Sequence, residues 1–241
     1  MAPKRKRVLL KLSGEALTGP KGIFPYDPDT LLSVAQEIAA TMDKGVEVAV
    51  VVGGGNIFRG ADGASRGMDR SMADQFGMLA TVQNGLVLLD LLERRCNLAV
   101  RLMSGLSMPK VAEDFIVRRA TRHLEKGRVV ILAGGTGNPM CTTDYAAALR
   151  ASEIDAVFIA KATNTDGVYD RDPRKDPAAT LLPRVDYARC IRDGLNVMDV
   201  EAFGLCEKQR IPIRVFSLQE EGNITAVLTG ADIGSLVCAA A

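Results

Sequence analysis

The chain has 241 residues, 47% of them hydrophobic, and a formal net charge of +1. This length and composition fit one sizeable α/β domain with a large core. A balanced charge gives the surface as a whole no attraction to nucleic acid or to a membrane, and we expect neither partner. No uninterrupted apolar run reaches the about 20 residues that a helix needs to span a bilayer.

Five cysteines are scattered along the chain without metal-ligand spacing: Cys96, Cys141, Cys190, Cys206 and Cys238. Their odd number and the lack of a C-x-x-C pair favour free thiols in a reducing cytoplasm over a disulfide framework or a zinc site. The basic run Lys4–Arg7 predicts a solvated, flexible tail over residues 1–6. The single histidine, His123, lies among charged residues and is expected on the surface.

Short apolar runs alternate with segments of helical periodicity along the chain. The expected strands are Val8–Leu12, Glu47–Val52, Leu98–Met103, Val129–Ala133, Ala156–Ala160, Ile213–Phe216 and Ser235–Cys238. The expected helices are Leu31–Met42, Asp69–Arg95, Val111–Glu125, Ala146–Arg150, Asp186–Arg192, Val200–Lys208 and Ile224–Leu228. This alternation predicts a single-domain three-layer α/β/α sandwich over residues 1–241, with a mainly parallel central sheet.

Three further segments are expected to lack long helices and strands. Gly19–Asp29 is rich in glycine and proline and predicts a loop. Gly60–Gly67 is small and polar and predicts a mobile segment. Asp166–Pro177 is rich in turn residues, and its first part, Asp166–Tyr169, predicts a hairpin that adds antiparallel strands.

One stretch combines three glycines with several polar side chains. Residues 131–144 read ILAGGTGNPMCTTD, so an apolar strand stops at two glycines and a helix-forming segment follows Asp144. Glycines let a ligand approach the backbone closely, and the N-terminus of a helix favours anions. Thr142 and Thr143 are suitable N-cap residues, and an acid suits the first helical turn. A capped turn needs fewer polar groups than this, and we predict a site for a phosphorylated ligand.

Polar, glycine-rich segments follow four of the expected strands. They are Lys11–Gly14, Gly53–Asn56 with Arg59, Gly134–Asp144, and Lys161–Asn164. The carboxyl ends of parallel strands meet at one edge of a sheet, where α/β proteins bind their ligands. Two lysines, an arginine and many backbone amides at this edge suit a polyphosphate. The chain has no P-loop or dinucleotide-binding motif, and its single histidine offers no Ser-His-Asp or Cys-His centre.

Five groups of residues together carry a family resemblance. They are Lys11–Glu15, Gly53–Asn56 with Phe58–Gly60, Gly77–Thr81, Gly135–Pro139 with Thr142–Asp144, and Lys161–Thr163 with Asp166–Tyr169. In order and spacing, from about Val8 to Val237, the chain resembles the bacterial uridylate (UMP) kinases of the amino acid kinase superfamily. The resemblance implies the amino acid kinase fold. It also implies reversible transfer of the γ-phosphoryl of ATP to UMP, giving UDP and ADP, in pyrimidine nucleotide biosynthesis.

The resemblance also implies which residues bind each nucleotide. On the ATP side it places Lys11, Leu12, Ser13, Gly14, Gly55, Arg59, Thr163, Asn164, Tyr169 and Asp172. On the UMP side it places Gly54, Asp74, Thr136, Gly137, Asn138, Pro139, Met140, Cys141, Thr142 and Thr143. Asp74 would contact the sugar hydroxyls of UMP. Mg²⁺ would arrive with ATP, and no residue is assigned to a metal held by the protein itself.

The expected catalytic roles follow the chemistry of phosphoryl transfer, which depends mainly on alignment and neutralisation of charge. The accepting phosphate oxygen is already ionised, so no general base is required. Lys11 and Lys161 would flank the transferred group, and Arg59 would hold phosphate oxygens. Asp144 would repel phosphate, so it is expected to orient the lysines or to contact the metal through water. The structural alternatives are a surface position for Lys161 and a purely capping role for Asp144.

The chain departs from the family pattern beside the expected uracil. Met140-Cys141 stand where the family has an aromatic residue, Tyr145 replaces a small residue, and Thr165 stands where valine is usual. These differences would change packing next to the base. The family norm further implies a homohexamer, with helix 69–95 as a contact surface, activation by GTP and inhibition by UTP. We assign no residues to these regulators.

Two other functions use the same fold. One is an amino-acid or carbamate kinase of the superfamily, and the other is a non-catalytic nucleotide-binding or storage protein. Asp74 ahead of Gly77–Thr81, together with the complete Gly-Thr-Gly-Asn-Pro run, disfavours the first. The presence of both lysines and of Asp144 disfavours the second.

Overall fold

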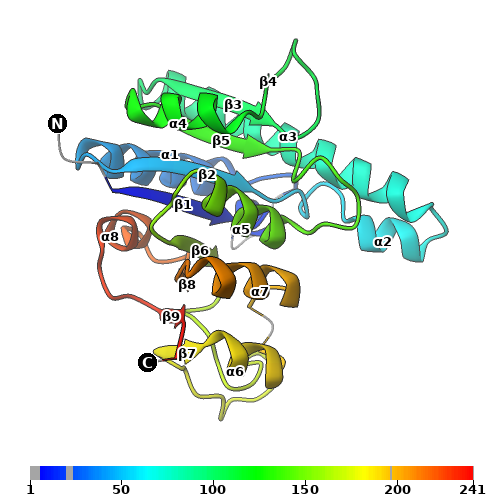
Figure 1. Ribbon diagram of the computed structural model, residues 1–241, viewed down its shortest axis with the longest axis vertical. Helices are drawn as coiled ribbons and strands as arrows, with labels where there is room; N and C mark the ends of the chain where they lie inside the picture. Colours follow the sequence, from blue (N-terminus) through cyan, green and yellow to red (C-terminus); the bar gives the residue numbers. More distant parts are fainter. Residues whose placement is uncertain (1–5, 20–23, 196, 241) are drawn as a thin grey trace.

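The computed structural model describes residues 6–19, 24–195 and 197–240 (Figure 1). Within these ranges a nine-stranded sheet has the order β4-β3-β5-β2-β1-β6-β8-β9-β7. The strands are β1 (Arg7–Leu12), β2 (Glu47–Val52), β3 (Val100–Ser104), β4 (Glu113–Asp114), β5 (Val129–Ala133), β6 (Ile159–Thr163), β7 (Arg184–Asp186), β8 (Ile213–Ser217) and β9 (Ser235–Cys238). Every pairing of these strands is parallel except β8 with β9.

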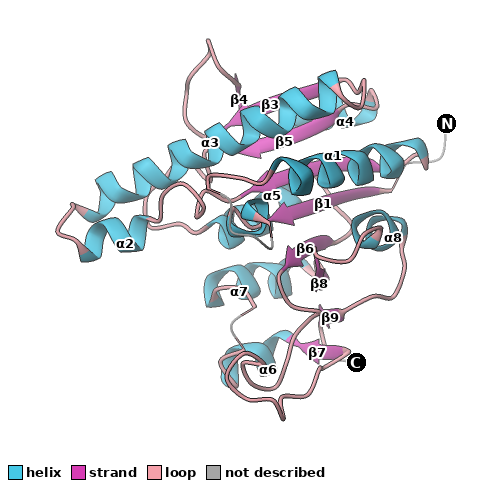
Figure 2. Cartoon of the chain, turned by 180° about the vertical axis from the view of Figure 1, so that it is seen from behind, coloured by secondary structure: helices cyan, strands magenta, loops and turns pink. Residues whose placement is uncertain are grey.

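Helices cover both faces of the sheet. They are α1 (Pro28–Asp43), α2 (Gly60–Ser65), α3 (Arg70–Arg94), α4 (Val117–Glu125), α5 (Thr143–Glu153), α6 (Tyr187–Arg192), α7 (Val200–Gln209) and α8 (Asn223–Thr229), with a 3₁₀ helix η1 (Glu15–Thr18). Helices α1, α3 and α8 share one hydrophobic core with the sheet (Figure 2), and α4 to α7 share the other. The predicted three-layer α/β/α sandwich with a mainly parallel sheet is confirmed.

Alternation along the strands decides which side chains reach each face. In β1, Leu10 packs under α1 and α3, whereas Leu9 packs on the opposite face under α5 and its neighbours. Lys11 follows by the same alternation on the face of Leu9. In β6, Lys161 lies two residues after Ile159, which packs on that same face. The register pairs Lys11 directly with Lys161 across the two strands. The fold therefore sets two lysines side by side.

The four polar segments predicted to meet do meet. Strands β5, β2, β1 and β6 are consecutive in the sheet and parallel, so their carboxyl ends lie at one edge. At the centre of this edge, Gly53 donates its N–H to the carbonyl of Leu12 at 2.9 Å. A Cβ atom added to Gly14 would lie 2.7 Å from the nitrogen of Gly55. Small residues here let the loops after β1 and β2 touch.

The strand expected at Ala156–Ala160 is displaced towards the C-terminus. It occupies Ile159–Thr163, because Asp155 adopts a left-handed φ of 55° and regular pairing with β1 begins at Leu9 with Ile159. As a result Lys161 lies inside a buried strand and not after its end. Its side chain is 9% exposed, which contradicts a surface position.

The helix expected at Val111–Glu125 begins only at Val117. Its first part forms β4, because Glu113 and Asp114 pair with the end of β3. The carboxylate of Glu113 then reaches Nε2 of His123 at 3.2 Å, while Arg128 contacts Nδ1 at 2.9 Å. His123 is therefore partly buried and paired, with 14% of its side chain exposed, and not the freely exposed residue expected from the sequence.

One further segment has more regular structure than expected, and another has less. Gly60–Gly67 contains the short helix α2, in which Gly63 packs so closely on Phe58 that an added Cβ would lie 2.7 Å from its ring. The Asp166–Tyr169 hairpin is reduced to one antiparallel bridge between Tyr169 and Leu181. Residues 1–5 of the expected tail and residues 20–23 of the Gly19–Asp29 loop lie outside the described residues.

Helix α3 is long and projects with α2 from one end of the molecule (Figures 1 and 2). By length and composition it is the one helix in the described part of the chain that would suffice to cross a membrane. Asp74, Asn84 and Asp90 interrupt its apolar sequence. It packs on β3 and β5 as a layer of the sandwich.

Candidate active site

Two lysines and one aspartate form a compact buried cluster at the carboxyl edge of the sheet. Asp144, in the first turn of α5, bridges a lysine of β1 and a lysine of the neighbouring strand β6. Its Oδ1 is 2.8 Å from Nζ of Lys11, and its Oδ2 accepts a hydrogen bond of 2.8 Å from Nζ of Lys161. Lys161 also donates to the carbonyl of Val197. We call Lys11, Asp144 and Lys161 the lysine–aspartate cluster.

The ionisation of this cluster follows from burial and pairing. Burial by itself would raise the pKa of Asp144, but the charges of Lys11 and Lys161 outweigh it and hold that pKa at about 2. Burial and the charge of Lys11 lower the pKa of Lys161 to about 8, against the opposing effect of Asp144. Near neutral pH the cluster therefore carries two positive charges and one negative charge, which leaves an excess positive charge for an anion.

Residues 134–142 form a loop on one side of the cluster, here called the glycine loop. Gly134, Gly135 and Gly137 have φ values of 68°, 55° and 85°, which residues with a side chain rarely adopt. A Cβ atom on Gly137 would also lie 2.4 Å from the carbonyl oxygen of Gly105. The three glycines thus permit a backbone path that no other residue type would follow without strain.

Side chains from distant elements hold the glycine loop in place. Thr81 of α3 accepts from the N–H of Gly134 at 2.7 Å, and Asp74 accepts from the N–H of Met140 at 2.9 Å. Thr142 caps α5 by accepting from the N–H of Tyr145 at 3.0 Å, which confirms the predicted N-cap. These contacts place the expected UMP residues 136–143 and Asp74 together. Of this set, Met140 and Cys141 are exposed, and Met140 has a left-handed φ of 63°.

Gly54, also expected on the UMP side, lies beneath helix α3. A Cβ atom at this position would lie 2.8 Å from the carbonyl of Gly77 and 2.9 Å from the side chain of Ala80. A side chain here would therefore force α3 away from the carboxyl end of β2. The glycine brings the backbone of the β2 loop next to the helix that carries Asp74.

A cavity of about 480 Å³ opens at the two lysines of the cluster. Among the residues expected to bind ATP, its walls include Lys11, Ser13, Thr163, Asn164, Tyr169 and Asp172. Lys161 also lines it, and Asp144 joins both lysines to helix α5, which the glycine loop precedes. The volume lies within the range of small-molecule sites.

The remaining expected ATP residues differ in what they offer. The side chain of Leu12 is buried in the core on the opposite face and its carbonyl accepts from the N–H of Gly53, so Leu12 offers a ligand no side chain. Gly14 and Gly55 bring the loops after β1 and β2 together. Arg59 is ion-paired with Glu15, which itself lines the cavity. An anion that binds Arg59 must therefore compete with Glu15.

Asn84 and Asp199 lie at the site but carry no sequence signal of their own. The buried amides of Asn56 and Asn84 bond to each other at 2.7 and 3.1 Å, and Asn84 also donates to the carbonyl of Gly53 at 2.7 Å. Asp199 accepts from the hydroxyl of Thr142 and from the N–H of Ala202, so it joins the N-cap of α5 to that of α7. An asparagine in a helix and an N-cap aspartate are ordinary in sequence, and only their tertiary partners distinguish them.

The chain matches known proteins over nearly its whole length. Residues 6–217 match the amino acid kinase family. The solved UMP kinase of Bacillus anthracis is 38% identical with a TM-score of 0.92, covering 98% of this chain and 97% of that chain. The UMP kinase of Ureaplasma parvum is 32% identical with a TM-score of 0.90, covering 98% and 99%. The uridylate kinase of Archaeoglobus fulgidus is 26% identical with a TM-score of 0.73, covering 96% and 99%.

These matches confirm the resemblance drawn from the motifs. The family match includes the lysine–aspartate cluster and the glycine loop, and the sheet and helices superpose on solved relatives at more than 30% identity. This protein belongs to the amino acid kinase family.

Proposed function

We propose that the protein is a UMP kinase that transfers the γ-phosphoryl group of ATP to UMP. One observation carries the proposal most directly. Two buried lysines line a cavity of about 480 Å³, and Asp144 joins both to the helix that the glycine loop precedes. The similarity to the UMP kinases of Bacillus anthracis and Ureaplasma parvum supports the choice of acceptor.

In this proposal ATP occupies the cavity and UMP occupies the glycine loop with Asp74. An oxygen of the UMP phosphate attacks the γ-phosphorus, the bond from that phosphorus to the β–γ bridging oxygen breaks, and ADP leaves with the electron pair. Lys11 and Lys161 stabilise the negative charge of the group in transit. Asp144 keeps both ammonium groups on the line of transfer. No side chain needs to take a proton, because the accepting oxygen is ionised.

We propose that magnesium reaches the site as a companion of ATP. Both carboxylate oxygens of Asp144 face lysines, so this residue is not arranged as a direct metal ligand. Mg²⁺ commonly binds through substrate phosphates with few protein ligands. When bound, it supplies charge neutralisation on the phosphate oxygens.

The test is a phosphotransfer assay on the purified protein with ATP and Mg²⁺. UMP should be converted to UDP much faster than CMP or dTMP is phosphorylated, and carbamate and glutamate should be inert. The acceptor decides the assignment. If an amino acid or carbamate is phosphorylated and UMP is not, the protein is a different kinase of the family.

Lys11→Ala separates a kinase from a storage or regulatory protein of the same fold. In a kinase, turnover should fall by roughly 10²–10³-fold, because a charge that stabilises the transition state is lost, while the circular dichroism spectrum stays native. Arg94→Ala is the control, because Arg94 is an exposed arginine on α3. Unchanged turnover in Lys11→Ala would remove this lysine from the mechanism.

We also propose that the enzyme works in the cytoplasm in pyrimidine nucleotide biosynthesis, as a homohexamer activated by GTP and inhibited by UTP. All five cysteines are free thiols in the structure, which fits a reducing compartment. Titrating GTP and UTP into the UMP assay tests the regulators. A rate that neither nucleotide changes would contradict this regulation without affecting the assignment of the acceptor.

A further inference from the structure

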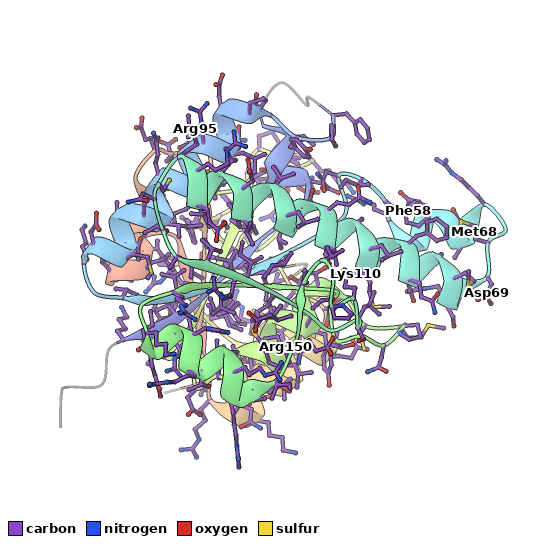
Figure 3. All side chains as sticks on the ribbon, turned by 90° about the horizontal axis from the view of Figure 1, so that it is seen from above. Phe58, Met68, Asp69, Arg95, Lys110 and Arg150 are labelled. Carbon is purple, nitrogen blue, oxygen red and sulfur yellow. The ribbon has the colours of Figure 1, made fainter. Side chains whose placement is uncertain are left out.

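Arg150, in α5, is a buried arginine that the proposed phosphoryl transfer does not use. Only 7% of its side chain is exposed. A guanidinium remains ionised under all ordinary conditions, and a buried charge is costly unless it is paired and hydrogen-bonded. Figure 3 shows Arg150 in the body of the molecule, away from the projecting end where Met68 and Asp69 are labelled. Its partners therefore indicate its purpose.

The guanidinium of Arg150 connects three parts of the fold. Nη1 donates to Glu153 on the next turn of α5 at 2.7 Å, and Nη2 donates to the carbonyl of Gly135 in the glycine loop at 3.2 Å. Its central carbon lies 3.8 Å from the centre of the Phe115 ring, within the range of a cation–π contact. The backbone N–H of Phe115 donates to the carbonyl of Ser104 at 2.9 Å, so this platform is fixed to β3.

The contact with Gly135 orients a whole peptide group. The carbonyl of Gly135 and the N–H of Thr136 belong to one planar trans unit, in which the two groups point in opposite directions. Because Arg150 holds the carbonyl on its own side, the N–H of Thr136 is directed away from it. No group in the described part of the chain accepts from this N–H. Thr136 is also among the residues expected to bind UMP.

We propose that Arg150 is a positioning residue for the acceptor nucleotide. By holding the carbonyl of Gly135, it presents the N–H of Thr136 as a preset hydrogen-bond donor to an oxygen of UMP. The N–H of Gly137 donates to the carbonyl of Gly134 at 3.0 Å and closes a turn around this peptide. Glycines at 135 and 137 let the peptide inside the turn face either way, so the bond from Arg150 selects one orientation. The inference rests on the proposed function for the identity of the acceptor.

The first test compares Arg150→Lys with the native enzyme. Lysine keeps the charge but loses the planar fork and the stacking on Phe115. We expect KM for UMP to rise about tenfold, with KM for ATP changed less than about twofold and kcat nearly unchanged. The control is Arg122→Lys, because Arg122 forms the same i,i+3 pair, with Glu125 at 3.3 Å, on the exposed face of α4. It should change neither KM.

The second test needs no nucleotide. Hydrogen exchange of the unliganded protein should be about tenfold faster over residues 134–142 in Arg150→Lys than in the native chain, with no change in β1. Because this experiment uses no nucleotide, it tests the anchoring role of Arg150 even if the acceptor is not UMP. A failure of the anchoring role can therefore be told apart from a failure of the proposed function. If Arg150→Lys does not fold, Phe115→Leu removes only the stacking platform and should raise KM for UMP about threefold.

Unchanged exchange over residues 134–142, or an unchanged KM for UMP in a folded variant, would overturn the proposal. A parallel rise of KM for both nucleotides would also overturn it, because a general loss of structure would then explain the effect.

Discussion

Asp144 holds the catalytic charges in one arrangement. Each of its carboxylate oxygens faces one ammonium group at 2.8 Å, and all three side chains are largely buried. Two lysines in register on neighbouring strands would repel each other without this shared counter-ion. Asp144 would repel phosphate, but its negative charge allows Lys11 and Lys161 to lie next to each other, where both can bind phosphate.

Asp144→Asn should lower kcat by roughly a hundredfold or more while the UMP dissociation constant changes less than about threefold. The amide keeps the size of the side chain but leaves two buried ammonium groups without a negative partner, so the transition-state charge is less well matched. Steady-state kinetics and calorimetric titration of UMP check both quantities. The matched control is Asp90→Asn, on the exposed face of α3. Weak UMP binding with normal kcat would instead identify Asp144 as a binding residue.

The lowered pKa of Lys161 predicts an alkaline limit of activity. Since burial and Lys11 bring this pKa to about 8, kcat/KM should fall about tenfold per pH unit above that value, as the ammonium group loses its proton. In Lys161→Arg the fall of kcat/KM between pH 7 and 9.5 should disappear, because arginine keeps its charge. The overall rate of this variant should be lower. A pH–rate profile that stays flat above about pH 8 in the native enzyme would contradict the assignment.

The same shift separates loss of activity from unfolding. The pKa of Lys161 in the folded chain lies below its ordinary 10.5, so between about pH 8 and 10.5 the unfolded chain binds more protons at this site. The contribution of Lys161 to the free energy of unfolding therefore rises with pH across this window. Thermal denaturation at pH 8 and 9 should show that the fold persists while activity declines.

At the level of elements, the glycine loop depends on left-handed backbone conformations, which residues other than glycine rarely adopt. Gly137 combines a left-handed φ of 85° with a neighbouring carbonyl 2.4 Å from where a Cβ would lie. The conformation alone costs a side chain about 1–2 kcal/mol, and the contact adds to that. The loop must move if the residue is changed.

Gly137→Ala should raise KM for UMP at least about tenfold and leave KM for ATP nearly unchanged, because only the glycine loop is displaced. Gly45→Ala is a matched control, since Gly45 also has a left-handed φ, of 77°, but an added Cβ meets nothing within 4 Å. It should lower the free energy of unfolding by about 1 kcal/mol without changing either KM. Equal kinetic effects of the two variants would show that backbone strain, and not the position of the loop, is responsible.

For the whole molecule, the exposed apolar side chains of α3 indicate an assembly. Met72, Phe76, Leu79 and Leu86 recur at helical spacing and are each at least 38% exposed. Apolar groups gathered in this way on a projecting helix are typical of contact surfaces. We expect this stripe to bury itself against a second copy in the proposed hexamer.

Leu79→Glu should lower the mass measured by light scattering, because a charge in an apolar contact is costly. Val157→Glu is the control, because Val157 is 51% exposed and lies outside α3. The unmodified protein should elute as an oligomer at micromolar concentration. A monomeric mass for the unmodified protein would contradict the assembly, and an unchanged mass for Leu79→Glu would place the interface elsewhere.

The sequence by itself determined most of the strands and helices and their order, the parallel α/β class and the four segments that carry the chemistry. It did not predict β4, β7, α2 and η1. The features that it determined rest on local properties, namely the period of apolar residues, helix caps such as Thr142 and glycines at strand ends. Local patterns also identified Lys11, Asp144 and Lys161, and the family motifs assigned nucleotides to their surroundings. Their mutual geometry was only an expectation.

Tertiary structure decided what depends on register and on distant partners. It displaced β6 so that Lys161 is buried beside Lys11, turned the start of an expected helix into β4, and gave His123 partners that keep it partly buried. It also gave Arg150 its role, through a carbonyl 15 residues away and a ring on another element. Such contacts join residues far apart in sequence, so no local pattern encodes them.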